Sequence, residues 1–337
     1  MKHYSLLYQD PAKRLPHAAV PGFLARRPTA ACHVTILLGL YNGAAYLDDQ
    51  LESFVRQNHR NWSLRVRDDG SDDDGPAIAR RFAATMPGRD IQVFSGPRRG
   101  AARNFLSLLD FVPHGSDAIA FSDQDDVWLP GKLSRALDRL VSVPDGVPAL
   151  YCGPTILTDS ALRIRGHSPL FRHPPSLRNA LVQSIAGGNT MVLNRAGFRL
   201  LRRAAAYRGP VPSHDWWAYQ VITGAGGIIL YDRDPQVLYR QHGANLVGSN
   251  RGVRAGMSRL AGLAAGKLRR WSDQNIAALT GAAPLLTPGN HELLMDFAEF
   301  RKASLRGRLS GLSQSGIHRQ TRPGTVALWA AAAAGQL

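Results

Sequence analysis

The 337-residue chain has little cysteine and no long hydrophobic run. Its two cysteines, Cys32 and Cys152, have no Cys or His partners at zinc-finger spacing, which excludes a disulfide scaffold and a zinc finger. No apolar run reaches the roughly 20 residues that span a bilayer. Residues 1–27 also lack the apolar core of a signal peptide. We therefore expect a soluble, cytoplasmic protein.

Acidic residues are scarce relative to basic ones. The chain has 41 Lys and Arg against 25 Asp and Glu, a formal net charge of +16. Residues 241–337 contain twelve Lys and Arg against four Asp and Glu. A nucleic acid, an anionic membrane surface or an anionic small substrate would each suit this charge. Solvated surface arginines would explain it equally well, so charge alone leaves these alternatives open.

The chain divides into three expected regions. Residues 1–30 form an arm rich in Pro and Arg, residues 31–250 an α/β domain, and residues 251–337 a basic helical region. In the middle region, short apolar runs alternate with amphipathic helical patterns, which predicts βαβ units and a mostly parallel sheet. The expected strands are residues 34–38, 64–66, 91–94, 118–121, 149–152, 228–231 and 237–239. The expected helices cover residues 47–55, 76–85, 101–111, 130–141 and 177–182, with more from about Arg254.

Polar residues follow the expected strands where each one ends. Ligands of such sheets bind at the carboxyl ends of the strands. In extended backbone, Asp123 and Asp125 project to the same side, and a divalent cation would relieve their repulsion. A solvated acidic turn is the alternative. Asp68 and Asp69 also end a strand, and they form either a capping turn or hydrogen bonds to a nucleotide's base or ribose. Two acidic clusters disfavour nucleic-acid binding at this edge.

Several segments together resemble glycosyltransferase family 2, and within it the rhamnosyltransferase-like branch of bacterial surface-polysaccharide synthesis. The Asp-Gln-Asp-Asp-x-Trp and His-Asp-Trp-Trp segments are specific in combination. The similar segments are residues 34–43, 68–71, 100–105, 121–133, 187–191, 214–217 and 239–245. The resemblance implies a GT-A fold, a nucleotide-sugar donor, a divalent cation (Mg²⁺ or Mn²⁺) and an inverting displacement. Residues 38–40 depart from the family's usual Pro and Thr.

The resemblance also implies roles for individual residues. Asp125 and His242 would contact the metal or diphosphate, and Asp215 would be the catalytic base. Residues expected at the nucleotide sugar are Tyr41, Asn42, Asp69, Arg103, Asn104 and Asp123. Residues expected at the acceptor are Gly188, Asn189, Trp216 and Trp217. Tryptophans are more often core residues, so a core position is the alternative for Trp216 and Trp217. For Asp215 the alternative is a helix cap, which does not exclude its role as base.

The expected reaction transfers L-rhamnose from dTDP-L-rhamnose to a lipid-linked or growing polysaccharide. A UDP-hexose or UDP-hexosamine donor is the alternative within the enzyme class. A non-catalytic basic protein that binds membrane or nucleic acid on a degenerate transferase fold is the alternative outside it. Leu260, Leu263 and Leu268 lie among basic residues, a pattern that suits a helix at the membrane surface or one packed on the catalytic domain.

Overall fold

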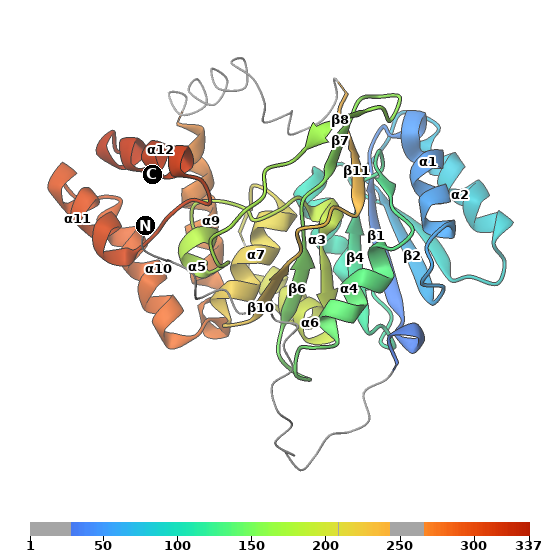
Figure 1. The fold of residues 1–337 in the computed structure, drawn as a ribbon, viewed down its shortest axis with the longest axis horizontal. Helices are drawn as coiled ribbons and strands as arrows, with labels where there is room; N and C mark the ends of the chain where they lie inside the picture. Colours follow the sequence, from blue (N-terminus) through green and yellow to red (C-terminus); the bar gives the residue numbers. More distant parts are fainter. Residues whose placement is uncertain (1–27, 208, 243–265) are drawn as a thin grey trace, which may run out of the picture.

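The computed structural model describes residues 28–207, 209–242 and 266–337. Within them, a seven-stranded sheet has the order β10-β6-β9-β4-β1-β2-β3, and a four-stranded sheet has the order β5-β11-β7-β8. Helices flank the larger sheet on both faces, and the C-terminal helices stand at one end of the molecule (Figure 1). The fold is therefore the expected α/β class with a C-terminal helical extension.

The strands are β1 (Val34–Leu40), β2 (Trp62–Asp68), β3 (Ile91–Ser95), β4 (Ala118–Ser122), β5 (Val127–Trp128), β6 (Ala149–Cys152), β7 (Ile156–Thr158), β8 (Ile164–His167), β9 (Val192–Asn194), β10 (Ile228–Tyr231) and β11 (Val237–Arg240). In the larger sheet only β9 runs antiparallel to its neighbours, β4 and β6. The mostly parallel arrangement is confirmed. The second sheet, with β7 and β8, was not predicted because its strands are short and β8 is largely exposed.

The helices are α1 (Ala44–Val55), α2 (Gly75–Thr85), α3 (Ala101–Leu108), α4 (Lys132–Leu140), α5 (Leu177–Ala180), α6 (Arg195–Tyr207), α7 (His214–Gly224), α9 (Lys267–Gly281), α10 (Pro288–Phe300), α11 (Leu305–Ser315) and α12 (Arg322–Ala333). The expected helix at Leu260 and Leu263 lies outside the described residues. Leu268, on α9, is partly buried against the core. None of the described helices is long and apolar enough to cross a membrane.

Strand β1 is buried on both faces, as its unbroken apolar run predicts. Ile36 and Leu38 pack in the core beneath α1, α2 and α4. Leu37 points to the opposite core, which also contains Trp217 of α7 and Phe297 of α10. The C-terminal helices therefore share a hydrophobic core with one face of the sheet.

Candidate active site

The carboxyl ends of β1, β2 and β4 meet at one edge of the larger sheet. Leu40 pairs with Asp68 of β2, and Leu38 pairs with Ser122 of β4. The polar segments that follow these strands are therefore neighbours in space, as the parallel order requires. The structure brings together the two acidic clusters that lie more than 50 residues apart in sequence.

Gln124 joins the ends of β4 and β1. Its Oε1 accepts a hydrogen bond from the Tyr41 amide at 2.7 Å, and its Nε2 donates to the Tyr41 carbonyl at 2.8 Å. A Cβ on Gly43 would lie 2.3 Å from Gln124 Cδ, so only glycine fits there. Asn42 adopts a left-handed φ of 48°, and its Oδ1 accepts from the Asp72 amide. Tyr41 is 41% exposed. Its hydroxyl accepts a hydrogen bond from Arg98 Nε at 3.1 Å, and the Arg98 guanidinium lies 5.1 Å from the centre of the Tyr41 ring.

Asp69 is buried, and both of its carboxylate oxygens have main-chain partners. The amides of Arg99 and Gly100 donate to them at 3.0 and 2.6 Å. Gly100 has a φ of 86°, a conformation that glycine adopts readily. Asp69 therefore holds the loop that leads into α3 next to the end of β2.

The structure separates the two residues expected on α3. Arg103 is exposed, whereas Asn104 is buried. The Asn104 amide accepts from Arg67 Nη1 and donates to the Arg67 carbonyl, both at 2.7 Å. The Asn104 side chain therefore fixes Arg67 of β2 and is not exposed to a ligand in the way that Arg103 is.

The acidic segment after β4 is bent, not extended. Strand β4 ends at Ser122, and the chain bends at Gln124 and Asp125 before β5. The expectation that Asp123 and Asp125 share one side of a strand is therefore wrong. The pKa of Asp123 is raised, first by burial and then by the negative charges of Asp126, Asp125 and Asp215. The Asp125 carboxylate therefore still acts on Asp123.

Asp126 is fully buried in a polar network. Asn189 Nδ2 donates to its Oδ2 at 2.5 Å, and the Arg240 amide donates to its Oδ1 at 3.2 Å. Burial and the nearby Asp125 charge raise the pKa of Asp126 to about 7. Asn189 thus binds the acidic segment through its side chain, an arrangement that the acceptor prediction did not include.

Lys132 is also fully buried beside this network. Its Nζ donates to the Asn189 carbonyl at 2.6 Å and lies 3.2 Å from the centre of the Trp128 ring. Burial lowers the pKa of Lys132, while the Asp126 and Asp123 charges oppose this effect. The Lys132 charge in turn lowers the pKa of Asp123 and Asp126 against the effect of burial.

Strand β11 brings two cationic or potentially cationic side chains to the acidic segment. Arg240 is buried, donates to the Asp125 carbonyl at 2.9 Å and pairs with Asp49 of α1 at 2.6 Å. His242 Nε2 lies 2.8 Å from Asp125 Oδ2, and its ring lies 4.7 Å from that of Tyr46. The expected Asp125 and His242 pair is therefore in direct contact.

Asp215 lies in the first turn of α7, half-buried, with its Oδ1 accepting from the Trp216 amide at 2.6 Å. The preceding His214 is buried and stacks on Phe105 with ring centres 3.9 Å apart. Burial lowers the pKa of His214 to about 4, although the Asp215 charge raises it. A Cβ on Gly188 would lie 2.2 Å from His214 Nε2, so the loop at Gly188 packs directly on this ring.

The two tryptophans of this segment are core residues. Trp217 has no exposed surface and belongs to the core beneath α7. Trp216 is buried, and its indole N–H donates to the Ala180 carbonyl at 2.6 Å. The expectation that they line an acceptor pocket is corrected, because their apolar rings are buried by packing within the domain.

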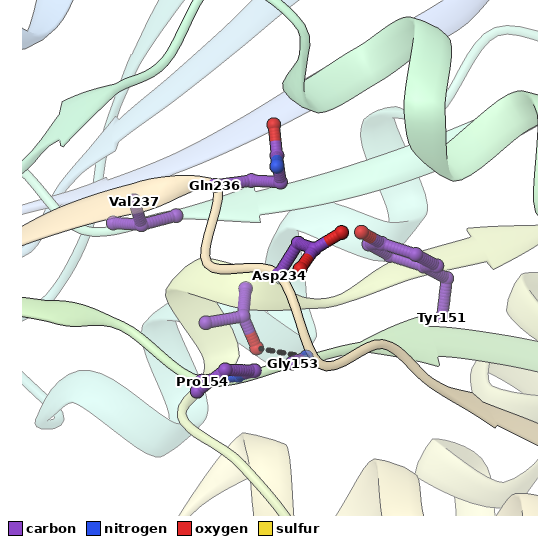
Figure 2. Close-up of a pocket in the computed structure, with 7 residues that line it drawn as sticks. Tyr151, Gly153, Pro154, Asp234, Gln236 and Val237 are labelled. Carbon is purple, nitrogen blue, oxygen red and sulfur yellow. Dashed lines mark hydrogen bonds between the residues drawn. The ribbon is translucent and has the colours of Figure 1, made fainter. Parts of the chain in front are cut away.

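Two cavities lie outside the acidic segment. One of about 10 Å³, large enough for a single water, lies between the end of β6 and the loop before β11 (Figure 2). There the Gly153 amide donates to Thr190 Oγ1 at 3.5 Å. A cavity of about 450 Å³ opens where β4 begins and is lined by Leu137, Leu140 and Arg195. Neither is formed by the expected site residues.

Asp125 and His242 are the described residues that could hold a divalent cation. Among the described residues, no three His, Cys, Asp or Glu side chains come together as a metal site. Asp125 and His242 supply two adjacent donors. Mg²⁺ is usually bound by one or two carboxylates together with substrate phosphates, so two protein donors fit a cation shared with a diphosphate.

Sequence reasoning missed Asp126, Lys132 and Arg240 as parts of this site. All three lie inside segments that were singled out, residues 121–133 and 239–245. Buried ionisable groups are rare unless they are paired, but the sequence contains no local signal that these side chains are buried.

Comparison with known proteins defines the class. A family model described as glycosyl transferase family 2 matches residues 35–206, half of the chain. The chain therefore belongs to glycosyl transferase family 2 and is a glycosyltransferase with a GT-A fold.

Particular relatives are similar over different lengths. The dTDP-rhamnosyl transferase RfbG of Shigella flexneri is 29% identical over 255 residues, which cover 71% of this chain and 83% of that protein. The Escherichia coli enzyme UDP-Glc:alpha-D-GlcNAc-diphosphoundecaprenol beta-1,3-glucosyltransferase WfgD is 24% identical over 130 residues, 38% of this chain and 48% of that protein. The S. aureus TarS structure with UDP-GlcNAc has a TM-score of 0.54 at 14% identity and covers 90% of this chain and 88% of that chain, which supports the fold.

Proposed function

We propose that this glycosyltransferase moves L-rhamnose from dTDP-L-rhamnose to a lipid-linked or growing polysaccharide at the cytoplasmic face of a membrane, with inversion and with a divalent cation. The contact of Asp125 with His242, beside Asp123 at the end of β4, is the observation that supports the chemistry. Similarity to a dTDP-rhamnosyl transferase over 83% of its length supports the donor. Similarity to a glucosyltransferase that acts on a diphosphoundecaprenol-linked sugar supports a diphosphate-linked lipid acceptor.

The protein side chains have separate tasks in this proposal. The exposed Tyr41 ring lies at the end of β1 and would contact the nucleotide base, next to Asn42 and Asp69. Asp125 and His242 would hold the cation, which would neutralise the charge that develops on the departing diphosphate. Arg240 fixes the Asp125 main chain, because its guanidinium donates to the Asp125 carbonyl.

Asp215 is the proposed base. It would take the proton of the acceptor hydroxyl as that oxygen forms its bond to the anomeric carbon. The bond from the anomeric carbon to the diphosphate breaks with its electron pair on the leaving oxygen. The contact with the Trp216 amide orients the carboxylate, and Gly188 packs on the adjacent His214. We therefore propose the Gly188 and Asn189 loop as one wall of the acceptor site.

We also propose residues 31–250 as the catalytic unit and residues 251–337 as a helical extension that supports it. Trp217 and Phe297 belong to one core, which supports stable docking of the described helices. Residues 1–27 of the proposed N-terminal arm lie outside the described part of the chain.

Calorimetric titration tests the donor site. The purified chain is titrated with dTDP and with UDP, in Mn²⁺ and then in EDTA, for the natural chain, Asp125→Ala and Asp138→Ala. Asp138 is an exposed aspartate on α4 and serves as the matched control. We expect dTDP binding that needs Mn²⁺, is lost in Asp125→Ala and persists in Asp138→Ala.

The other outcomes separate the alternatives. Binding of UDP in place of dTDP would favour a UDP-hexose or UDP-hexosamine donor, as the glucosyltransferase relative suggests. Unchanged dTDP binding in EDTA would contradict the proposed requirement for a divalent cation. If dTDP binds, radiolabelled dTDP-L-rhamnose and isolated lipid-linked acceptors then test the transfer itself.

A further inference from the structure

Helix α12 has apolar side chains on two opposite faces. Leu328, Ala331 and Ala332 are buried against the preceding helices. On the other face, Val326 is 69% exposed and Trp329 is 37% exposed. Positions three and four apart lie on one side of a helix, so Val326, Trp329 and the exposed Ala330 and Ala333 form a continuous outer stripe. We name these four residues the outer stripe of α12.

The outer stripe lies in the part of the chain that has no acidic side chain. Residues 301–337 contain six Lys and Arg and no Asp or Glu. Two of the arginines have partners within the fold, since Arg301 pairs with Asp273 and Arg308 donates to main-chain carbonyls of α12. Lys302, Arg306 and Arg322 are exposed. Residues 301–337 thus combine an exposed apolar stripe with exposed basic residues and contain no acidic side chain.

The start of α11 belongs to the same surface. Arg308 Nε donates to the Ala332 carbonyl at 2.6 Å and its Nη2 to the Ala333 carbonyl at 3.0 Å. The first turn of α11 therefore lies against the last turn of α12. Leu305 is 49% exposed in that turn, next to Arg306.

We propose that the outer stripe of α12, with Lys302, Arg306 and Arg322 around it, docks on the surface of an anionic lipid bilayer. An interfacial helix buries an apolar face that contains Trp in the headgroup region, while flanking basic residues contact anionic lipids. Twelve residues are too few to cross a bilayer, so the helix lies along the surface. This inference rests on the proposed function in one respect: contact with the bilayer would bring the enzyme to its lipid-linked acceptor.

This membrane contact lies on α12 and not at Leu260, Leu263 and Leu268, the residues that the sequence suggested. Leu268, which lies among the described residues, packs against the core. A nucleic acid would also be attracted by the positive charge, but its phosphates would make no favourable contact with an apolar stripe of Val, Trp and Ala. The combination of exposed indole, exposed Val and uniform positive charge favours a lipid surface.

Vesicle flotation tests the proposal on the full chain. Vesicles contain phosphatidylcholine alone or phosphatidylcholine with phosphatidylglycerol, and the variants are Val326→Glu, Trp329→Glu and the double variant. Ile164→Glu is the matched control, because Ile164 is an apolar residue of β8 that is 65% exposed. We expect binding to anionic vesicles that falls with added salt. The double variant should lower it about tenfold or more, because it adds two like charges and removes apolar contact.

Three results would overturn the proposal: no binding of the natural chain to anionic vesicles, equal binding by the double variant, or equal loss in Ile164→Glu. Sedimentation without lipid is the second measurement. Self-association that is lost in the double variant would show that a second copy covers the stripe, which also contradicts docking to lipid.

Thermal unfolding confirms that each variant folds. Nucleotide titration of the same proteins tests the donor site separately, so failure of one proposal leaves the other measurable.

Discussion

The imidazole Nε2 of His242 lies 2.8 Å from Asp125 Oδ2, although 117 positions separate the two residues. Strand β11 makes this contact possible, since it pairs with β5 directly after the acidic segment. Arg240, two residues earlier on β11, binds the Asp125 carbonyl. The end of β11 is therefore fixed to the acidic segment by two side chains.

The first prediction concerns His242. If His242 and Asp125 hold one cation, His242→Ala removes a donor and should raise the Mn²⁺ concentration needed for dTDP binding roughly 10–100-fold. Titration of dTDP binding against Mn²⁺ measures this. His114→Ala replaces an exposed histidine and should leave the Mn²⁺ requirement unchanged. If His242→Ala needs the same Mn²⁺ concentration as the natural chain, His242 is not a ligand of the cation.

The second prediction concerns Asp215. Asp215→Asn keeps the shape of the side chain but removes the proton acceptor, so the transfer rate should fall roughly 10²–10⁴-fold. Binding of dTDP should not change, because the nucleotide does not need this base. Transfer rates and calorimetry on one preparation separate the two effects. A rate within a fewfold of the natural chain would mean that another group takes the proton.

The third prediction concerns Lys132. Lys132→Met removes the hydrogen bond to the Asn189 carbonyl and a buried positive charge that lowers the pKa of Asp126. Removing one member of a group of interacting buried charges typically costs about 3 kcal/mol or more of unfolding free energy. Denaturant unfolding measures this loss.

Two further variants control the Lys132 measurement. Lys302→Met replaces an exposed lysine and should change the unfolding free energy by less than about 0.5 kcal/mol. Asp126→Asn in the Lys132→Met background should restore part of the loss, because the buried carboxylate no longer lacks a cation. Strictly additive losses would show that Lys132 and Asp126 do not interact.

The fourth prediction concerns pH. Asp232 is buried, which raises its pKa, but hydrogen bonds from Arg135, the Asp234 amide and Tyr151 outweigh burial and lower it to about 2. Because this pKa lies below the ordinary 3.8, the stabilisation is present above pH 3.8 and is lost as the pH falls toward 2. We expect the unfolding free energy to fall by about 2 kcal/mol over this range.

Asp234 supplies the matched control for the pH experiment. It pairs with the same Arg135, but its side chain is 67% exposed, whereas that of Asp232 is 2% exposed. Asp232→Asn should reduce the acid-dependent loss by about 2 kcal/mol, and Asp234→Asn should leave the loss unchanged. If the unfolding free energy of Asp232→Asn falls with pH as steeply as that of the natural chain, other carboxylates cause the loss.

Much of the fold could be predicted from local sequence. The bounds of β6 and β10 match the expected strands, because both segments are unbroken apolar runs. Strand β6 is buried, whereas β10 is partly exposed at the edge of the sheet. Strand β2 is longer than expected at its start, since Trp62 and Ser63 belong to it. The positions of the acidic clusters followed from strand order alone, because parallel strands end at one edge.

The sequence by itself determined the α/β class, the edge of the sheet where the polar segments gather and the family that those segments resemble. These features depend on residue spacing within each segment. Only the tertiary structure decided that Trp216 and Trp217 are core residues, that the segment after β4 bends, and that Lys132, Asn189 and Asp126 form one buried network. Burial and partner choice depend on packing between segments dozens of residues apart, and no local pattern encodes that packing.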